Sequence, residues 1–200
     1  MSLDSAAVRP DAIAEQLRAD IIAQRDKPGS TITESAVAVR FGVARPTARL
    51  AIERLVAEGI LRREAHQAAR VPVLGRDDII DLFEARAIIE SAAVAALTTV
   101  PVTARGSGDS AADDIAFHRA LVAGQSSPRL TRMHNLLLGE IELCIGQVHA
   151  EHLVSASDMA AQHQRILDAL TAGDPASAAR LTREHIEYAR DALLERTTRG

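Results

Sequence analysis

Four polar side chains in the C-terminal part of the sequence have types and spacings that suit a metal ion. Asp114 and His118 lie four residues apart in the stretch "DDIAFHRAL", so they share one face of a predicted helix. His163 and His185 each lie in a later amphipathic stretch. Transition metals need three or four nitrogen or oxygen ligands that converge. We therefore interpret these four residues as one candidate metal site.

Hydrophobic periodicity indicates that both later imidazoles point into a helical bundle. The predicted inward faces carry His163, Ile166, Leu167 and Leu170 in one helix, and Leu181, His185, Tyr188 and Ala189 in the next. A buried imidazole without a partner is costly, and one shared metal ion would satisfy all of these polar groups together.

The other polar candidates in this region have plainer interpretations. His149 and His152 form a second pair with a possible metal spacing, but they end a predicted helix, where positive charge is favourable, so we expect solvated or capping side chains. His134 is expected at the edge of the core, and Cys144 as a small buried hydrophobe. Because Cys144 is the only cysteine, no intramolecular disulfide can form, and we expect a cytoplasmic protein.

Composition and charge predict a mostly α-helical chain with two domains. Of the 200 residues, 47% are hydrophobic and 2% aromatic, so the core must be built from aliphatic side chains. Residues 1–75 carry a net charge of +2 and residues 76–200 a net charge of −6, which suggests two domains with different roles. The stretch "GRDD" at 75–78 is the predicted linker, so we expect the domains to span 1–75 and 76–200. The sequence has no long uninterrupted apolar run, so we expect neither a membrane-spanning segment nor a membrane partner.

The order of predicted elements differs between the two domains. Three helices and a small two-stranded β-hairpin ("ILRRE" and "RVPVL") form the outline of a winged helix-turn-helix in the first domain. The second domain is expected to be an antiparallel all-α bundle. The predicted helices span 11–25, 34–41 and 45–58, then 78–98, 110–123, 128–152, 156–172 and 174–196.

The stretch "PGSTITESAVAVRFGVARPTARLAIERLVAEGIL" resembles the winged-helix domain of the GntR superfamily of bacterial repressors. The resemblance implies a double-stranded operator DNA as partner. The residues expected to contact DNA are Arg40, Arg45, Thr47, Arg49 and His66. Arg45 and Arg49 open the third helix on one face, where a recognition helix meets phosphates and guanine edges.

The second domain resembles the FCD ligand-binding domain of the FadR-like branch of that superfamily. The resemblance rests on "LFEARAIIESAAVAAL", on the Asp-x-x-x-His pair, and on the two later histidines. It implies that Asp114, His118, His163 and His185 bind a divalent transition metal, zinc or nickel. Three histidines and one aspartate leave open positions on an octahedral ion, so we expect a small carboxylate effector there, with Arg86 as the candidate clamp. The family usually has another helix where this sequence has the loop 98–110.

These features together predict a bacterial transcription regulator, and specifically a repressor controlled by an organic acid bound at the metal. A homodimer is expected because one helix-turn-helix reads only a half-site. Two alternatives stay open: a metal-dependent hydrolase fused to a helix-turn-helix, and a DNA-binding protein whose metal is purely structural. The sequence shows no obvious general base or nucleophile beside the four ligands, so we expect no enzyme.

Overall fold

The computed structural model describes residues 9–97 and 110–197, and these form two compact units, Met1–Val73 and Leu74–Gly200. The sequence predicted the boundary between residues 75 and 76, at the "GRDD" linker, and the two units of the structure divide between Val73 and Leu74. The loop that stands where the family has a further helix lies outside the described residues, apart from Ser110. Each unit is described below by itself.

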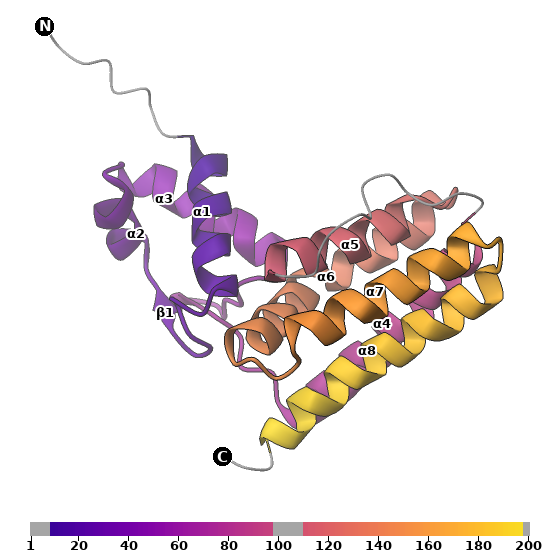
Figure 1. The fold of residues 1–200 in the computed structure, drawn as a ribbon. Coiled ribbons are helices and arrows are strands. Elements are labelled where there is room, and N and C mark those ends of the chain that lie inside the picture. The colour runs from indigo at the N-terminus through magenta and orange to yellow at the C-terminus, as the bar shows by residue number, and fades with distance from the viewer. Residues whose placement is uncertain (1–8, 98–109, 198–200) are drawn as a thin grey trace, which may run out of the picture. The chain divides into compact units, whose positions relative to one another are not determined.

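The N-terminal unit is a small three-helix domain with a short sheet (Figure 1). Its elements are α1 (Pro10–Ile22), β1 (Thr31–Ile32), α2 (Glu34–Phe41), α3 (Arg45–Ala57) and β2 (Ala69–Arg70). Helix α3 packs against both α1 and α2. The apolar positions that recur every three to four residues, such as Leu17 on α1 and Ile52 and Leu55 on α3, are fully buried in this core.

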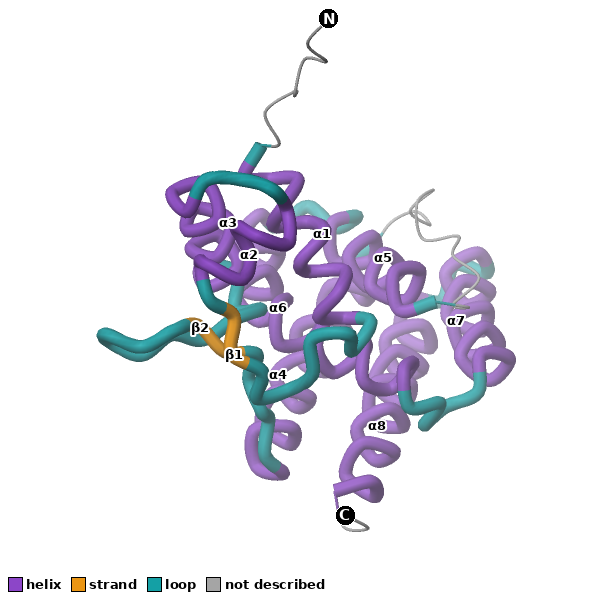
Figure 2. The backbone as a smooth tube through the Cα atoms, turned by 90° about the vertical axis from the view of Figure 1, so that its left-hand side faces the viewer, coloured by secondary structure: helices purple, strands orange, loops and turns teal. Residues whose placement is uncertain are grey.

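The sheet differs from the predicted hairpin. Strand β2 pairs antiparallel with β1, with Thr31 opposite Arg70 and Ile32 opposite Ala69. Figure 2 shows the two short strands side by side. The expected first hairpin strand contributes a single bridge, from Arg62 to Arg70. The backbone N–H of Leu61 instead donates to the carbonyl of Leu55 at 3.1 Å, directly after α3, so it is not available for strand pairing.

Local signals set the ends of the helices around the turn. The hydroxyl of Thr33 accepts a hydrogen bond from the Ala36 N–H at 3.1 Å and caps α2. Gly42 ends that helix with a φ of +64°, a left-handed conformation that glycine adopts without strain. Pro46 lies in the first turn of α3, where its missing N–H costs nothing. The bounds of α2 agree with those predicted from the sequence.

The C-terminal unit is helical throughout its described residues, as the sequence predicted. It contains α4 (Arg76–Ala95), α5 (Ala111–Ala123), α6 (Pro128–Ala150), α7 (Ala156–Thr171) and α8 (Pro175–Thr197). Helix α8 lies along α4 and α7, and α6 packs on α4 and α5 (Figure 1). The short connections make α5 and α6, and likewise α7 and α8, antiparallel neighbours. An apolar cluster that includes Val94, Phe117 and Ile166 fills the space between four of the helices.

None of the described helices has both the length and the apolar character that crossing a bilayer would require.

Replacing Ala44 with serine should strengthen the start of α3. Ala44 occupies the N-cap with extended backbone (φ −68°, ψ 148°), yet its methyl group cannot accept a hydrogen bond. A serine hydroxyl should stabilise the helix by about 1 kcal/mol, and Thr33→Ala, which removes an existing cap, should cost about as much. Hydrogen exchange with mass spectrometry on peptides from 34–57 measures both effects. Equal exchange in the two variants would contradict the assignment of these caps.

Candidate metal centre

Three helices bring the four predicted ligands together in the C-terminal unit. Helix α5 supplies Asp114 and His118, α7 supplies His163, and α8 supplies His185. All four side chains are buried, and one nitrogen or oxygen atom of each lies within 4.8 Å of the others. Ligands bound to one ion by bonds of about 2.1 Å lie up to about 4 Å apart, so the four atoms need move only slightly to share one.

Several polar atoms of this cluster have no hydrogen-bond partner within the described part of the chain. They are Oδ1 of Asp114 and both ring nitrogens of His163. Oδ1 of Asp114 lies 3.2 Å from Nε2 of His118 and 3.5 Å from Nε2 of His163. Leaving buried polar atoms unpaired costs about 1–3 kcal/mol each. The donor set of three imidazoles and one carboxylate fits a divalent transition metal ion, which would satisfy these atoms.

The electrostatics of the cluster favour the protonation states that a metal requires. Burial opposes the ionisation of Asp114, but the nearby imidazoles of His118, His149 and His163 outweigh it and hold the pKa of the carboxyl well below its ordinary value. Burial lowers the pKa of His163 and depresses the pKa of His185 strongly, with further lowering from neighbouring imidazoles. An ionised carboxylate and neutral imidazoles are the metal-binding forms of these side chains.

His118 has the opposite balance. Burial by itself would lower the pKa of its imidazole, but the negative charge of Glu90 raises it above the ordinary value. Oε2 of Glu90 lies 2.5 Å from Nδ1 of His118. Glu90 is fully buried, and Arg86 and His118 overcome the burial penalty and keep the pKa of its carboxyl well below the usual range. The cluster therefore includes a second buried carboxylate that sequence reasoning had placed only on the opening helix.

Glu90 also connects two further polar residues of the core. Its Oε1 accepts a hydrogen bond from Nε of Arg86 at 2.8 Å and lies 3.2 Å from Nε2 of His134. His134, expected at the core edge, is thus fully inside it and paired. Cys144 is a buried thiol as expected, and burial raises its pKa to about 12.

His149 corrects one expectation from the sequence. We expected a solvated or capping side chain, but Nε2 of His149 lies 3.0 Å from Oδ2 of Asp114, and the imidazole is 16% exposed. His152, by contrast, is exposed. The spacing of His149 and His152 could not reveal the contact, because its partner lies 35 residues away on another helix.

Arg86 lies in the wall of a small cavity that two of the candidate ligands also line. The cavity measures about 10 Å³ and is lined by Phe83, Arg86, Asp114, Ile145, Val148, Met159, His185 and Ala189. A space of this size holds about one water molecule. A carboxylate larger than that needs side chains to move, and the flexible Met159 is the wall residue best suited to move. Arg86 and the metal cluster thus border one common space.

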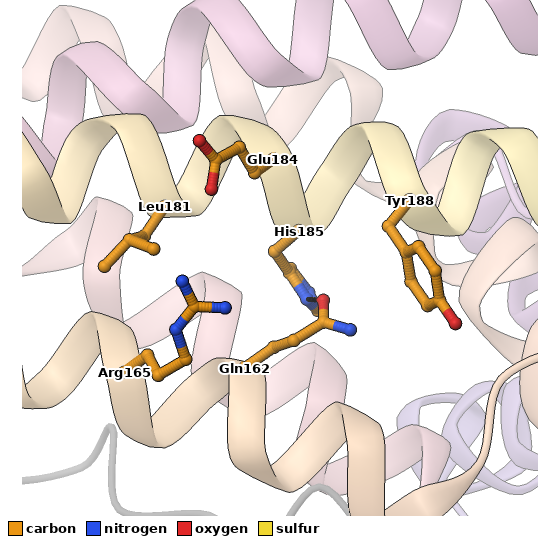
Figure 3. A pocket seen from close by; sticks show the side chains of 6 residues that line it. All are labelled: Gln162, Arg165, Leu181, Glu184, His185 and Tyr188. Atoms are coloured by element: carbon orange, nitrogen blue, oxygen red, sulfur yellow. Dashed lines mark hydrogen bonds between the residues drawn. The ribbon is translucent and has the colours of Figure 1, made fainter.

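A second, larger hollow lies between α7 and α8, next to the candidate ligand His185. It has a volume of about 200 Å³ and is lined by Gln162, Arg165, Leu181, Glu184, His185 and Tyr188 (Figure 3). Tyr188 borders this hollow with 49% of its surface exposed, so the expectation that it points inward was wrong. His185 lines both the hollow and the small cavity.

The residues predicted to contact DNA lie in the N-terminal unit. Arg45 and Arg49 are exposed at the start of α3, and Nε of Arg49 donates to Glu53 at 2.7 Å. Thr47 is half-buried, and His66 is exposed in the loop before β2 with a φ of +63°.

Arg40 has partners within its own unit. Its guanidinium forms ion pairs with Asp20 and with Asp26, the latter at 2.8 Å. These bonds hold Arg40 at the end of α2 beside the end of α1. A contact from Arg40 to DNA stays a prediction.

Comparison with known proteins assigns a family to each unit. Residues 10–71 match the model described as bacterial regulatory proteins of the gntR family, and residues 101–188 match the FCD domain. A probable D-xylose utilization operon transcriptional repressor of Paenarthrobacter nicotinovorans is 29% identical over 87% of this chain and 85% of the relative. The transcriptional repressor GlaR of Escherichia coli K12 is 27% identical over 85% of this chain and 89% of the relative.

Solved structures agree on the fold. The crystal structure of a protein described as a GntR transcriptional regulator, from Rhodococcus sp. RHA1, superposes with a TM-score of 0.78 at 24% identity, over 93% of this chain and 97% of that one. McbR/YncC of E. coli superposes with a TM-score of 0.68 at 17% identity, over 94% and 98%. With a gntR-type helix-turn-helix unit followed by an FCD unit, the chain belongs to the GntR family of bacterial transcription regulators.

Proposed function

We propose that the chain is a repressor whose affinity for its operator depends on a small organic acid bound at a metal ion. The observation that carries the proposal is the set of buried, unpartnered atoms on Asp114 and His163 within a cluster of three imidazoles. Asp114, His118, His163 and His185 would hold the ion, and zinc or nickel suits their donor set. When bound, the ion supplies a positive charge with open positions for an anionic ligand.

Arg86 is the proposed second contact of the effector. It borders the same small cavity as Asp114 and His185, so a carboxylate there can meet the guanidinium and the ion together. Nε of Arg86 is held by Glu90 at 2.8 Å, and the guanidinium lies 5.5 Å from the ring centroid of Phe83. These contacts fix the direction of the guanidinium before the effector arrives, which lowers the entropy cost of binding.

The N-terminal unit is proposed to read double-stranded operator DNA through α3. The exposed side chains of Arg45 and Arg49 lie where a recognition helix contacts base edges, while Thr47, Arg40 and His66 are candidates for backbone contacts. A homodimer would present two such helices to a symmetric operator. A regulator that binds bacterial operator DNA acts where that DNA lies, so we further propose that the protein acts in the cytoplasm. The names of the relatives support repression as the response.

Regulation requires that the effector bind more tightly to one of two states of the protein, and that these states differ in operator affinity.

Catalysis is a weaker interpretation of the same cluster of side chains. Glu90, the carboxylate that contacts His118, has both oxygens engaged, by Arg86 and His134 on one side and by His118 on the other. A general base needs an oxygen that can accept a proton from substrate or water. We therefore propose a sensing site and not an enzyme.

Metal binding should depend on His163. We expect wild-type protein to bind one zinc ion per chain and His163→Ala to lose most of its affinity, because one of the four ligands is gone. The measurement is zinc stoichiometry after dialysis, followed by competition with a chelator. His152→Asn is the matched control, since His152 is exposed and asparagine tolerates its φ of +52°.

Circular dichroism of the chelated protein distinguishes a metal ion that serves sensing from one that serves only to hold the fold. A helical spectrum that survives chelation supports a sensing site. Collapse of the C-terminal helices would instead assign the ion a structural role.

Carboxylate binding should require both the ion and Arg86. Calorimetry with acetate, lactate, succinate and citrate should detect binding to zinc-loaded protein and none to chelated protein. Arg86→Lys keeps the charge beside Glu90 but loses the bidentate fork, so we expect affinity to fall about tenfold. Zinc stoichiometry of the variant serves as the control. Equal carboxylate binding with and without zinc would refute the metal-linked effector site.

Operator binding should depend on Arg49. DNA fragments selected from a random double-stranded pool by the wild-type protein provide the probe for gel-shift titration. Arg49→Ala should weaken binding about tenfold or more, since a bidentate base contact is worth about 1–3 kcal/mol. Arg132→Ala, an exposed arginine on α6, should bind as wild type does. If both variants bind equally well, α3 is not the reading element.

A further inference from the structure

We propose that Gln162 and Glu90 are positioning residues that orient two of the metal ligands, His185 and His118. Each residue accepts a hydrogen bond from the Nδ1–H of its histidine, which fixes the tautomer and turns Nε2 toward the ion. The inference rests on the proposed metal site and assigns a role to residues outside the ligand set.

The contact of Glu90 defines the state of His118. Oε2 of Glu90 lies 2.5 Å from Nδ1 of His118, and Oε1 of the same carboxyl group already accepts a hydrogen bond from Nε of Arg86, so we assign the hydrogen of the short contact to the imidazole. In the neutral ring, Nε2 is then an unprotonated donor atom for a metal. That nitrogen faces Asp114 and His185, at 3.2 Å and 3.1 Å from Oδ1 and Nε2 respectively.

Gln162 plays the same part for His185. Its Oε1 lies 2.9 Å from Nδ1 of His185, across the gap between α7 and α8. Figure 3 shows the side chain of Gln162 extending from its helix to meet the imidazole at the inner end of the larger hollow. Gln162 directly precedes the ligand His163 on α7. Helix α7 thus supplies both the candidate ligand His163 and the residue that orients His185 on α8.

The two outer contacts have a joint consequence at the centre of the cluster. Nε2 of His118 and Nε2 of His185 lie 3.1 Å apart. If both rings carry their hydrogen on Nδ1, two lone pairs face each other at this distance and repel. The two nitrogens would instead hold a metal ion, which would supply the positive charge that removes this repulsion. The outer acceptors therefore convert a pair of stacked histidines into a site for a positive ion.

His163 provides an internal contrast. Neither of its ring nitrogens has a hydrogen-bond partner among the described residues, and the ring is held instead by stacking on Phe117, with centroids 3.8 Å apart and planes 16° from parallel. Stacking fixes the plane of a ring but not which nitrogen carries hydrogen. The proposal accordingly concerns His118 and His185 alone.

Substitutions of Gln162 test the proposal with little disturbance of the core, because Gln162 is half-buried and lines the open hollow. Gln162→Leu removes the acceptor and Gln162→Glu retains one. Gln164→Leu is the matched control, since Gln164 lies on the same helix, is exposed, and bonds to Asp168 at 2.7 Å. Thermal unfolding of the chelated variants verifies that all of them fold.

We expect Gln162→Leu to bind zinc about tenfold more weakly than wild type in chelator competition, the lower end of the usual cost of losing an outer partner of a metal ligand. Gln162→Glu should recover most of the affinity, and Gln164→Leu should match wild type. Nitrogen NMR of zinc-loaded, histidine-labelled protein should show the hydrogen on Nδ1 of both His118 and His185. These results together would support the proposal.

Other outcomes would overturn it. The outer contacts do not position the ligands if Gln162→Leu binds zinc as tightly as wild type does, or if Gln164→Leu loses as much zinc affinity as Gln162→Leu. Hydrogen on Nε2 of His118 or of His185 would lead to the same conclusion. Wild-type protein that binds no zinc is a different failure, because it removes the proposed metal site itself. In that case the NMR spectra of metal-free wild type and Gln162→Leu still decide whether Gln162 sets the tautomer of His185.

Discussion

A buried carboxylate that must stay ionised is the constraint on which the C-terminal unit depends. Asp114 lies among three imidazoles in an aliphatic core, where an uncompensated charge would be severely penalised. His149 compensates one oxygen of Asp114 by a hydrogen bond at 3.0 Å, while the other oxygen has no such partner among the described residues. The helices must therefore pack so that polar partners reach the carboxylate of Asp114 and compensate its charge.

Glu90 imposes the same demand on the opposite side of His118. Its two oxygens join Arg86, His134 and His118, so α4, α5 and α6 are connected by one buried polar network. Networks of this kind stabilise a fold only when every member is satisfied. The imidazole of His118 contacts both Asp114 and Glu90, so hydrogen bonds and close contacts connect the candidate metal ligands to Glu90 and to Arg86, the proposed effector contact.

Two spaces of different size meet at His185. The inner cavity admits about one water molecule, and the hollow between α7 and α8 is about twenty times larger and open. A ligand that enters the inner cavity must displace side chains, so its binding and a shift in packing are one event. Such coupling is the physical requirement for a sensor, because an effector can shift an equilibrium only by binding its two states differently.

Much of this protein could be predicted from its sequence, because periodicity and caps are local. The spacing of apolar residues predicted the helices, and Gly42 with a threonine cap, either Thr31 or Thr33, predicted the bounds of α2. The four candidate ligands followed from helical faces together with the resemblance to the FCD domain. The pairing of Thr31 with Arg70, the contact of His149 with Asp114 and that of Gln162 with His185 were decided only by the tertiary structure. Helical periodicity tells which face a residue occupies, but the register between two helices depends on the packing of the whole core.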